Sequence, residues 1–253
     1  MPLRSFSGGA LFAETFGEGP PRVLALHGWG RRGRDFSQIL DGIPSLAPDL
    51  PGFGASPPPA EVIGAEGYAE IVKPLLDVFE RPPVLLGHSF GGRVATCVAA
   101  TNPDHVRGLV LTGAPVLRLG TASKPSTPYR LIRSLYRAGL VSEERMEAVR
   151  QRFGSADYRH ASGVMRDILV RVVNESYEDQ LKLIECPVAL VWGSADREVP
   201  VAVARRAFEI LGGGNGSDRA KGLTVIDGVG HNVPRDQPRA LREVVLDMLG
   251  GSG

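Results

Sequence analysis

A serine in a glycine-rich segment is the residue of this chain whose surroundings most clearly predict chemistry. The segment Gly87-His88-Ser89-Phe90-Gly91-Gly92 follows a short apolar run and precedes a helical pattern. A G-x-S-x-G segment between a strand and a helix turns so sharply that the serine is strained and its hydroxyl projects above the sheet. Ser89 is therefore a candidate nucleophile. The alternative is an ordinary glycine-rich turn; a dinucleotide-binding loop fits poorly, because no G-x-G-x-x-G is present.

A serine hydroxyl is a weak nucleophile, so the chain must also supply a base and an acid that orients this base. His231 follows the last predicted strand, and Asp196 follows the strand before it. Because the carboxyl ends of parallel strands meet at one edge of a sheet, we expect both side chains to lie near Ser89.

We expect the other histidines, and the other acidic residues near strand ends, to have structural roles. We expect His88 to pack beneath the turn, His27 to fix the loop that follows it, and His105 and His160 to be surface or cap residues. Asp49 and Asp227 could replace Asp196, but they are better explained as acceptors that stabilise loops. Arg197 and Glu198 are interpreted as a solvated pair.

The negative oxygen that forms when a serine attacks a carbonyl needs preorganised N–H donors. The amide of Phe90 is one candidate, because it lies at the start of a helix, where the partial charge is positive. The second candidate is the amide of Trp29 in His27-Gly28-Trp29-Gly30, which follows the first central strand. The alternative for this second segment is a plain glycine turn.

The candidate reactive residues are far apart in the sequence, so the strands and helices of the fold must bring their loops together. Short apolar runs alternate with helical patterns, which predicts an α/β fold with a mostly parallel central sheet and helices on both faces. The segments Leu3–Phe6 and Ala10–Phe16 predict a hairpin at one sheet edge. The other predicted strands are Val23–Leu26, Ser45–Pro48, Val84–Leu86, Gly108–Thr112, Val188–Val191 and Leu223–Ile226.

The alternation of strands and helices stops in the middle of the chain. We therefore expect a core domain of residues 1–115 and 185–253, with residues 116–184 inserted as a helical cap. Three helices are predicted in the cap: one from Thr127-Pro128 to Gly139, one from Ser142 to near Gly154, and one from Ser162 to Asn174. Helices placed over the strand ends could act as a lid and a pocket wall; the alternative is simple packing against the core.

Composition excludes several other classes of protein. The 253 residues carry 29 basic and 28 acidic side chains, a net charge of +1, so binding to nucleic acid through charge is not expected. The hydrophobic fraction of 43% is enough for one large core. Cys97 and Cys186 are interpreted as buried small hydrophobes, and no Cys/His spacing suggests zinc. Without a long apolar run or a signal-like start, we expect a cytoplasmic protein with no membrane span.

Together, the motifs resemble the α/β-hydrolase superfamily, in its cap-bearing serine hydrolase and carboxylesterase branch. The resemblance is carried by His27–Gly30, Asp49–Ser56, the Ser89 segment, Gly193 with Asp196 after it, and Gly230-His231, spread over residues 23–235. It includes small carboxylesterases that cleave pimeloyl esters. It implies that Ser89 is the nucleophile, His231 the base and Asp196 the orienting acid, and that the amides of Trp29 and Phe90 form the oxyanion hole.

The expected reaction is cleavage of a small-molecule carboxylic ester through an acyl-enzyme on Ser89, with no metal or organic cofactor. A serine at position 89 argues against relatives that use a carboxylate or a cysteine as nucleophile, such as haloalkane dehalogenases and dienelactone hydrolases. Hydrolysis of a carbon–carbon bond, a thioester or a lactone by the same triad stays open. So does a ligand sensor or binding protein with slow turnover. The sequence carries no signal for the oligomeric state.

Overall fold

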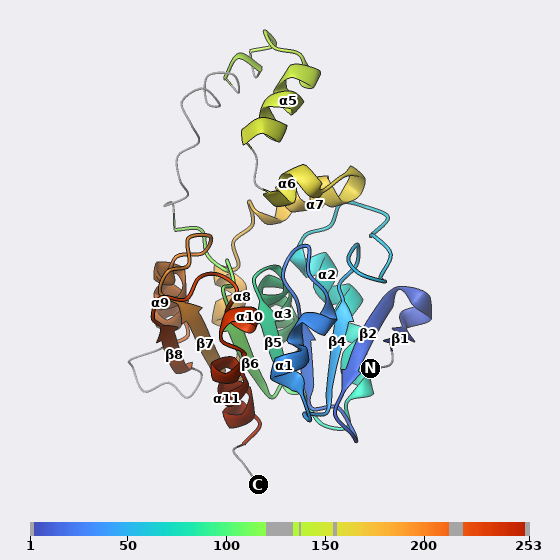
Figure 1. Cartoon of the computed structure of the whole chain (residues 1–253), viewed down its shortest axis with the longest axis vertical. Helices are drawn as coiled ribbons and strands as arrows, with labels where there is room; N and C mark the ends of the chain where they lie inside the picture. The colour runs from blue at the N-terminus through green and yellow to red at the C-terminus, as the bar shows by residue number, and fades with distance from the viewer. Residues whose placement is uncertain (1–2, 120–133, 137, 154–155, 213–219, 251–253) are drawn as a thin grey trace.

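An eight-stranded sheet forms the centre of the molecule, with helices on both of its faces (Figure 1). The computed structural model describes residues 3–119, 134–136, 138–153, 156–212 and 220–250. Strands are ordered β1-β2-β4-β3-β5-β6-β7-β8 across the sheet. They are β1 (Leu3–Phe6), β2 (Leu11–Phe16), β3 (Val23–Leu26), β4 (Ser45–Asp49), β5 (Val84–His88), β6 (Gly108–Thr112), β7 (Val188–Gly193) and β8 (Ala220–Ile226).

The strands from β4 to β8 are parallel in the order of the sheet, and among the eight strands β2 alone runs in the opposite direction. The β1–β2 hairpin is antiparallel and forms one edge, as the sequence predicts, and β2 pairs antiparallel with β4. The pairs β3–β4, β3–β5, β5–β6, β6–β7 and β7–β8 are all parallel. The loops after these strands therefore leave from one edge of the sheet, where the candidate reactive residues are expected.

Helices cover the sheet in two layers. One layer contains α2 (Ala65–Val72), α3 (Phe90–Thr101), α8 (Glu178–Leu183) and α9 (Val201–Ile210), and the other contains α1 (Ser37–Leu40) and α11 (Pro238–Met248). Successive side chains of a strand point to opposite faces. In β3, Leu24 and Leu26 accordingly pack with the first layer, while Val23 and Ala25 pack with the second. Burial on both faces explains why the strands consist mainly of Val and Leu.

The chain between β6 and β7 adds helices and, in its described part, no strand. These are α5 (Glu143–Phe153), α6 (Ala156–His160), α7 (Gly163–Val172) and α8. In Figure 1, α6 and α7 lie together beyond one end of the sheet, and α5 lies further out. The predicted helices from Ser142 and from Ser162 correspond to α5 and α7. The helix predicted to start at Thr127-Pro128 lies mostly outside the described residues.

Short helical turns complete the fold. They are η1 (Ser7–Gly9), η2 (Gly33–Phe36), η3 (Lys73–Val78), η4 (Pro103–His105) and α10 (Val233–Asp236). Cys97 and Cys186 are free and buried, as expected. Burial raises the pKa of the Cys97 thiol to about 12 and that of the Cys186 thiol to about 11, so both stay protonated and unreactive at neutral pH.

Candidate active site

Ser89 lies at the turn between β5 and α3 in a conformation that side chains rarely adopt. Its φ is 51° and its ψ is −116°, and its amide donates to the carbonyl of Thr112 at 3.0 Å. The turn depends on close backbone approach: a Cβ on Gly91 would lie 2.1 Å from the carbonyl oxygen of Leu26. A strained, non-glycine residue of this kind persists only where its surroundings fix it, and such residues cluster at functional sites.

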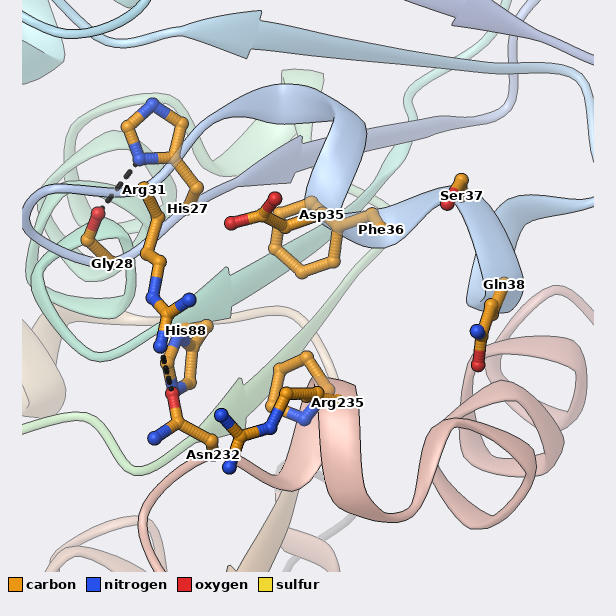
Figure 2. A pocket seen from close by; sticks show the side chains of 11 residues that line it. His27, Gly28, Arg31, Asp35, Phe36, Ser37, Gln38, His88, Asn232 and Arg235 are labelled. Atoms are coloured by element: carbon orange, nitrogen blue, oxygen red, sulfur yellow. Dashed lines mark hydrogen bonds between the residues drawn. The ribbon is translucent and has the colours of Figure 1, made fainter.

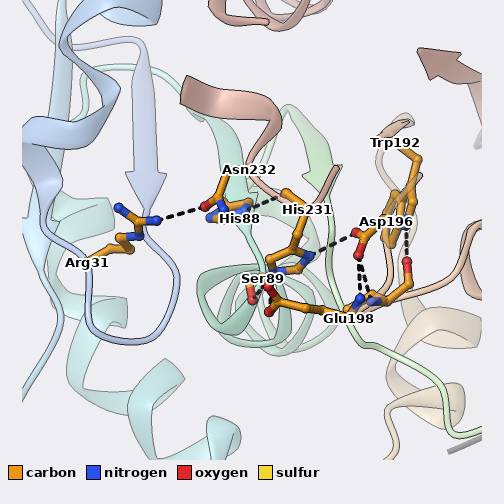
Figure 3. A network of polar contacts seen from close by, with 9 residues as sticks. Arg31, His88, Ser89, Trp192, Asp196, Glu198, His231 and Asn232 are labelled. Carbon is orange, nitrogen blue, oxygen red and sulfur yellow. Dashed lines mark hydrogen bonds and ion pairs between the residues drawn. The ribbon is translucent and has the colours of Figure 1, made fainter. Parts of the chain in front are cut away.

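Three side chains from three separate loops meet at the edge of the sheet (Figure 3). The Nε2 atom of His231 lies 3.0 Å from Ser89 Oγ, and its Nδ1 atom lies 2.8 Å from Asp196 Oδ2. Both distances are within hydrogen-bond range. The structure thus brings together the three residues that the sequence singled out, and the order hydroxyl, imidazole, carboxylate is suited to proton transfer away from the serine.

The Asp196 carboxylate is held by the loop that contains it. Its Oδ1 atom accepts hydrogen bonds from the amides of Glu198 at 2.9 Å and Val199 at 2.8 Å, which leaves Oδ2 for His231. Trp192, at the end of β7, donates its indole N–H to the carbonyl of Val199 at 2.8 Å and closes the loop. The carboxylate is therefore fixed in position before any substrate binds.

The charge of His231 is set by opposing effects. Burial lowers the pKa of its imidazole. The hydrogen bond and charge of Asp196, together with the charges of Glu198 and Asp157, raise this pKa by more than burial lowers it, so the net pKa lies above the ordinary value of 6.5. Glu198 Oε2 is 3.6 Å from His231 Nε2. The sequence-based interpretation of Glu198 as one of a solvated pair with Arg197 is therefore incomplete, because its carboxylate faces the imidazole.

His88 lies beneath the turn, as expected, and contacts the loop of His231 from below. Its Nε2 atom is 3.2 Å from the carbonyl oxygen of His231, and the two imidazole rings have centroids 5.2 Å apart. Burial and the nearby His231 lower the pKa of His88 to about 3. His88 is therefore neutral near pH 7 and donates Nε2–H to that carbonyl.

The two residues whose amides are the candidate oxyanion donors, Trp29 and Phe90, are far apart in the chain and have side chains in contact. Phe90 is the first residue of α3, so its amide has no partner within the helix. The rings of Trp29 and Phe90 pack edge to face with centroids 5.2 Å apart. A Cβ on Gly28 would lie 3.2 Å from Ser89 Cβ, so the loop that carries the Trp29 amide runs directly against the nucleophile.

The loops around the candidate site are fixed by the residues assigned to structural roles. His27 Nδ1 lies 2.8 Å from the carbonyl oxygen of Gly28, and its Nε2 accepts from the amide of Leu50 at 2.9 Å. Burial lowers the pKa of His27 to about 4, which keeps it neutral. Asp49 accepts from the amides of Gly33 and Ala55, and Asp227 accepts from the hydroxyl of Ser194. None of these three side chains contacts Ser89 among the described residues.

A cleft of about 540 Å³ lies between the inserted helices and the loops after β3 and β4. Its core side includes Trp29, Arg31 and Phe53, and its other side is formed by α6, α7 and the residues between them. Asp157 and His160 of α6 line this cleft, so a substrate in it would meet polar side chains as well as aromatic rings. The sequence did not single out Arg31 or Asp157.

A second, smaller cavity of about 150 Å³ lies between the loop after β3, which contains Gly28, and the residues that follow His231 (Figure 2). His27, His88 and Asn232 line it, together with the side chains of Arg31 and Arg235. The Arg31 guanidinium donates to Asn232 Oδ1 at 3.0 Å. Because Asn232 directly follows His231, this hydrogen bond is a second restraint on the loop that carries the imidazole.

The end of α7 is tied to the core by a buried arginine. Arg93 of α3 donates to the carbonyl of Val172, and its guanidinium lies 5.9 Å from the centroid of the Tyr177 ring. The Tyr177 hydroxyl donates to Glu175 at 2.6 Å, and the amide of Ala65 donates to the same carboxylate at 3.2 Å. In the sequence, Arg93 is the one charged residue of the run Phe90–Ala100, and this isolated charge could have indicated that its side chain has a buried partner.

The described residues hold no group of three or more His, Cys, Asp or Glu side chains arranged for a metal ion. None of the helices in the described ranges combines the length and apolar character that crossing a bilayer requires.

Comparison with known proteins identifies relatives over most of the chain. A model of the alpha/beta hydrolase family matches residues 23–244. A pimeloyl-[acyl-carrier protein] methyl ester esterase of Chromobacterium violaceum is 29% identical over 79% of this chain and 85% of its own length. Lipase LipV of Mycobacterium tuberculosis is 27% identical over 95% of this chain and 98% of its own length.

Solved structures share the fold at lower identity. The CarC serine hydrolase involved in carbazole degradation superposes with a TM-score of 0.71 at 21% identity, covering 98% of both chains. The lip1 protein of Acinetobacter baumannii AYE superposes with a TM-score of 0.71 at 17% identity, covering 98% of this chain and 90% of its own. The expected fold, a mostly parallel sheet with helices on both faces and an inserted helical region, is confirmed.

Proposed function

The chain belongs to the α/β-hydrolase family, and on this basis we propose that it is a serine hydrolase that cleaves carboxylic esters of small molecules. The observation that carries the proposal is the continuous contact from Ser89 Oγ through the His231 ring to Asp196, with distances of 3.0 Å and 2.8 Å. The esterase and lipase relatives favour ester substrates over other acyl compounds.

In the proposed reaction, His231 Nε2 takes the proton of Ser89 as Oγ attacks the ester carbonyl. The amides of Trp29 and Phe90 donate to the oxygen that becomes negative. The imidazolium then gives its proton to the leaving alcohol, and an acyl group remains on Ser89 Oγ. Water enters and attacks the acyl carbonyl as His231 takes one of its protons. The bond between the acyl carbon and Ser89 Oγ then breaks, and the imidazolium returns its proton to Oγ, which releases the acid and restores the serine.

Asp196 has two roles in this reaction. Its hydrogen bond to His231 Nδ1 keeps the proton on that nitrogen, so that Nε2 is free to accept one from Ser89. Its negative charge also stabilises the imidazolium that forms. We expect kcat/KM to rise with pH as His231 loses its proton, through an apparent pKa above 6.5.

We also propose that residues 116–184 act as a cap over the reactive groups. The proposal rests on the cleft between α6–α7 and the loops after β3 and β4, because Trp29, whose amide is a candidate oxyanion donor, lines this cleft opposite the inserted helices. Residues 1–115 and 185–253 would then form the core that supplies every reacting group, and the cap would supply a wall of the pocket.

The test of the proposed function is turnover of short acyl esters by the wild-type protein and by Ser89→Ala. We expect measurable steady-state hydrolysis in the wild type and a loss of several orders of magnitude in Ser89→Ala. Mass spectrometry of protein quenched during turnover should find the acyl group on the peptide that contains Ser89. Undiminished hydrolysis by Ser89→Ala would contradict the assignment.

The same experiment separates an enzyme from a slow ligand sensor that retains the triad. A sensor would release one equivalent of alcohol and then keep a lasting modification on Ser89. An enzyme returns to the free serine after every cycle, so product exceeds protein many times over.

A further inference from the structure

Glu198 contacts the nitrogen of His231 that faces the proposed nucleophile. Its Oε2 atom lies 3.6 Å from His231 Nε2, and the same nitrogen lies 3.0 Å from Ser89 Oγ. Figure 3 shows the Glu198 side chain extending beneath the imidazole ring toward Ser89. We propose that Glu198 is a positioning residue for His231, a second carboxylate that stabilises the imidazolium on its Nε2 side. This inference rests on the proposed function.

One turn carries both carboxylates and directs them to opposite sides of the ring. The amide of Glu198 donates to Asp196 Oδ1, so the backbone of Glu198 helps to fix Asp196. The side chain of Asp196 is only 1% exposed, whereas that of Glu198 is 66% exposed. Asp196 is therefore a fixed partner of Nδ1, and Glu198 approaches Nε2 from the solvent side, where its side chain is free to yield to a substrate.

Other charged groups surround His231, but they act from further away. Asp157 of α6 adds a third negative charge, and Arg31 after β3 adds a positive one next to Asn232. His88 lies below the ring and is neutral near pH 7. Among the described residues, only Ser89 and Glu198 are within interaction distance of Nε2 through their side chains.

A carboxylate at this place has two opposite effects on the reaction. It stabilises the imidazolium that forms as Ser89 is deprotonated, which lowers the barrier to acylation. It also makes His231 easier to protonate in the free enzyme, which removes active enzyme at acid pH. Loss of the charge should therefore reduce the maximal rate at high pH and extend activity to lower pH.

The experiment compares the wild type with Glu198→Gln. Gln keeps the size of the side chain and the backbone amide that donates to Asp196, so the fold is preserved. In protein without substrate, NMR titration of the His231 ring should give a pKa lower by about 0.2–0.7 units, as expected for an exposed ion pair. With p-nitrophenyl acetate, kcat/KM at its high-pH plateau should fall by about 1.5- to 5-fold, and its acid limb should move to lower pH.

Two controls identify the cause of these changes. Glu185→Gln removes an exposed carboxylate shortly before β7, at the end of the strand away from Ser89, and should change neither value. Because Glu198 is exposed, a high concentration of NaCl should reduce the difference in pKa between Glu198→Gln and the wild type.

An unchanged His231 pKa in Glu198→Gln overturns the proposal, even if the rate falls, because a rate change alone is what a merely structural role would give. A lower pKa with an unchanged plateau also overturns it. The NMR titration needs no turnover. If the wild type hydrolyses no ester, the proposed function fails, and the titration still decides whether Glu198 stabilises the imidazolium.

Discussion

The side chain of His88 supports the backbone of His231 from below. Its Nε2 atom lies 3.2 Å from the carbonyl oxygen of His231, and it is buried and neutral. The residue that precedes the proposed nucleophile thus fixes the loop of the proposed base. One hydrogen bond therefore joins the end of β5 to the loop that follows β8, and these two strands are not neighbours in the sheet.

The buried neutral histidines should make the protein sensitive to acid. The pKa values of His88 and His27 are lowered in the folded protein to about 3 and about 4, from 6.5 in the unfolded chain. Between pH 6.5 and about 4, the unfolded chain binds protons that the folded one does not, so the free energy of unfolding falls as the pH falls. Each histidine contributes a slope of about 1.4 kcal/mol per pH unit in this range.

Urea unfolding at several pH values measures this slope. His88→Gln keeps a donor for the His231 carbonyl but cannot be protonated, so it should remove the share that His88 contributes. His105→Gln alters an exposed histidine and should leave the slope unchanged. Equal slopes in His88→Gln and the wild type would contradict the prediction.

Asp196→Asn should abolish most activity while preserving the fold. The Asn oxygen can still accept from the amides of Glu198 and Val199. Its NH₂ group would then donate to His231 Nδ1, which places the histidine proton on Nε2. A protonated Nε2 cannot accept the proton of Ser89. We expect kcat to fall by about 10⁴-fold.

Steady-state kinetics together with circular dichroism checks this prediction. Asp227→Asn serves as the matched control, because Asp227 also accepts a hydrogen bond in a loop after a strand but lies away from the imidazole. An Asp196→Asn protein with more than a tenth of the wild-type kcat would show that another acid orients His231.

Gly28→Ala should disturb the proposed oxyanion hole. The added Cβ would lie 2.9 Å from His88 Nδ1 and 3.2 Å from Ser89 Cβ, so the loop must move and carry the Trp29 amide with it. Removal of one oxyanion donor costs about 10²–10³-fold in kcat, and we expect a loss near the lower figure. Gly222→Ala meets nothing within 4 Å and should be neutral. Comparable kcat values for the two variants would remove Trp29 from the mechanism.

Glu175→Gln should loosen the attachment of α7. The Glu175 carboxylate accepts from the amide of Ala65, the Tyr177 hydroxyl and Arg171 Nε. Burial raises its pKa, but the hydrogen bonds from Tyr177 and Arg171 outweigh burial and lower it below the ordinary value, so it is ionised near pH 7. An uncharged Gln should weaken these bonds by about 1–3 kcal/mol in total.

Hydrogen exchange followed by mass spectrometry should find faster exchange in the segment that joins α7 to α8. The control is Asp179→Asn, which breaks an exposed ion pair with Lys182 and should leave exchange in that segment unaltered. Unchanged exchange in Glu175→Gln would mean that Arg93 alone holds the end of α7.

The parts of the molecule that sequence predicts well are those set by local chemistry. The central strands are predictable because burial on both faces demands runs of Val and Leu, as in Leu109–Leu111 of β6. Ser89 is predictable because the sharp turn needs its flanking glycines. His231 and Asp196 follow from the rule that parallel strands end at one edge.

The parts that sequence does not predict depend on side-chain direction in three dimensions. Glu198 follows a catalytic candidate by two residues and is mostly exposed, which describes a solvated residue equally well. The position of Asp157 in the cleft depends on how α6 is rotated against the core. The sequence around either residue contains no pattern that fixes these orientations.

Ser89, His231, Asp196 and the candidate oxyanion amides all lie in the segments that directly follow strands of the sheet, and none lies in α5–α8. In the proposed function, the reacting groups are therefore encoded outside the inserted helices, which supply one wall of the cleft. A chimera that receives the corresponding insert of a relative should keep the reaction and acquire the donor's preference, which makes this segment the natural target for redesign.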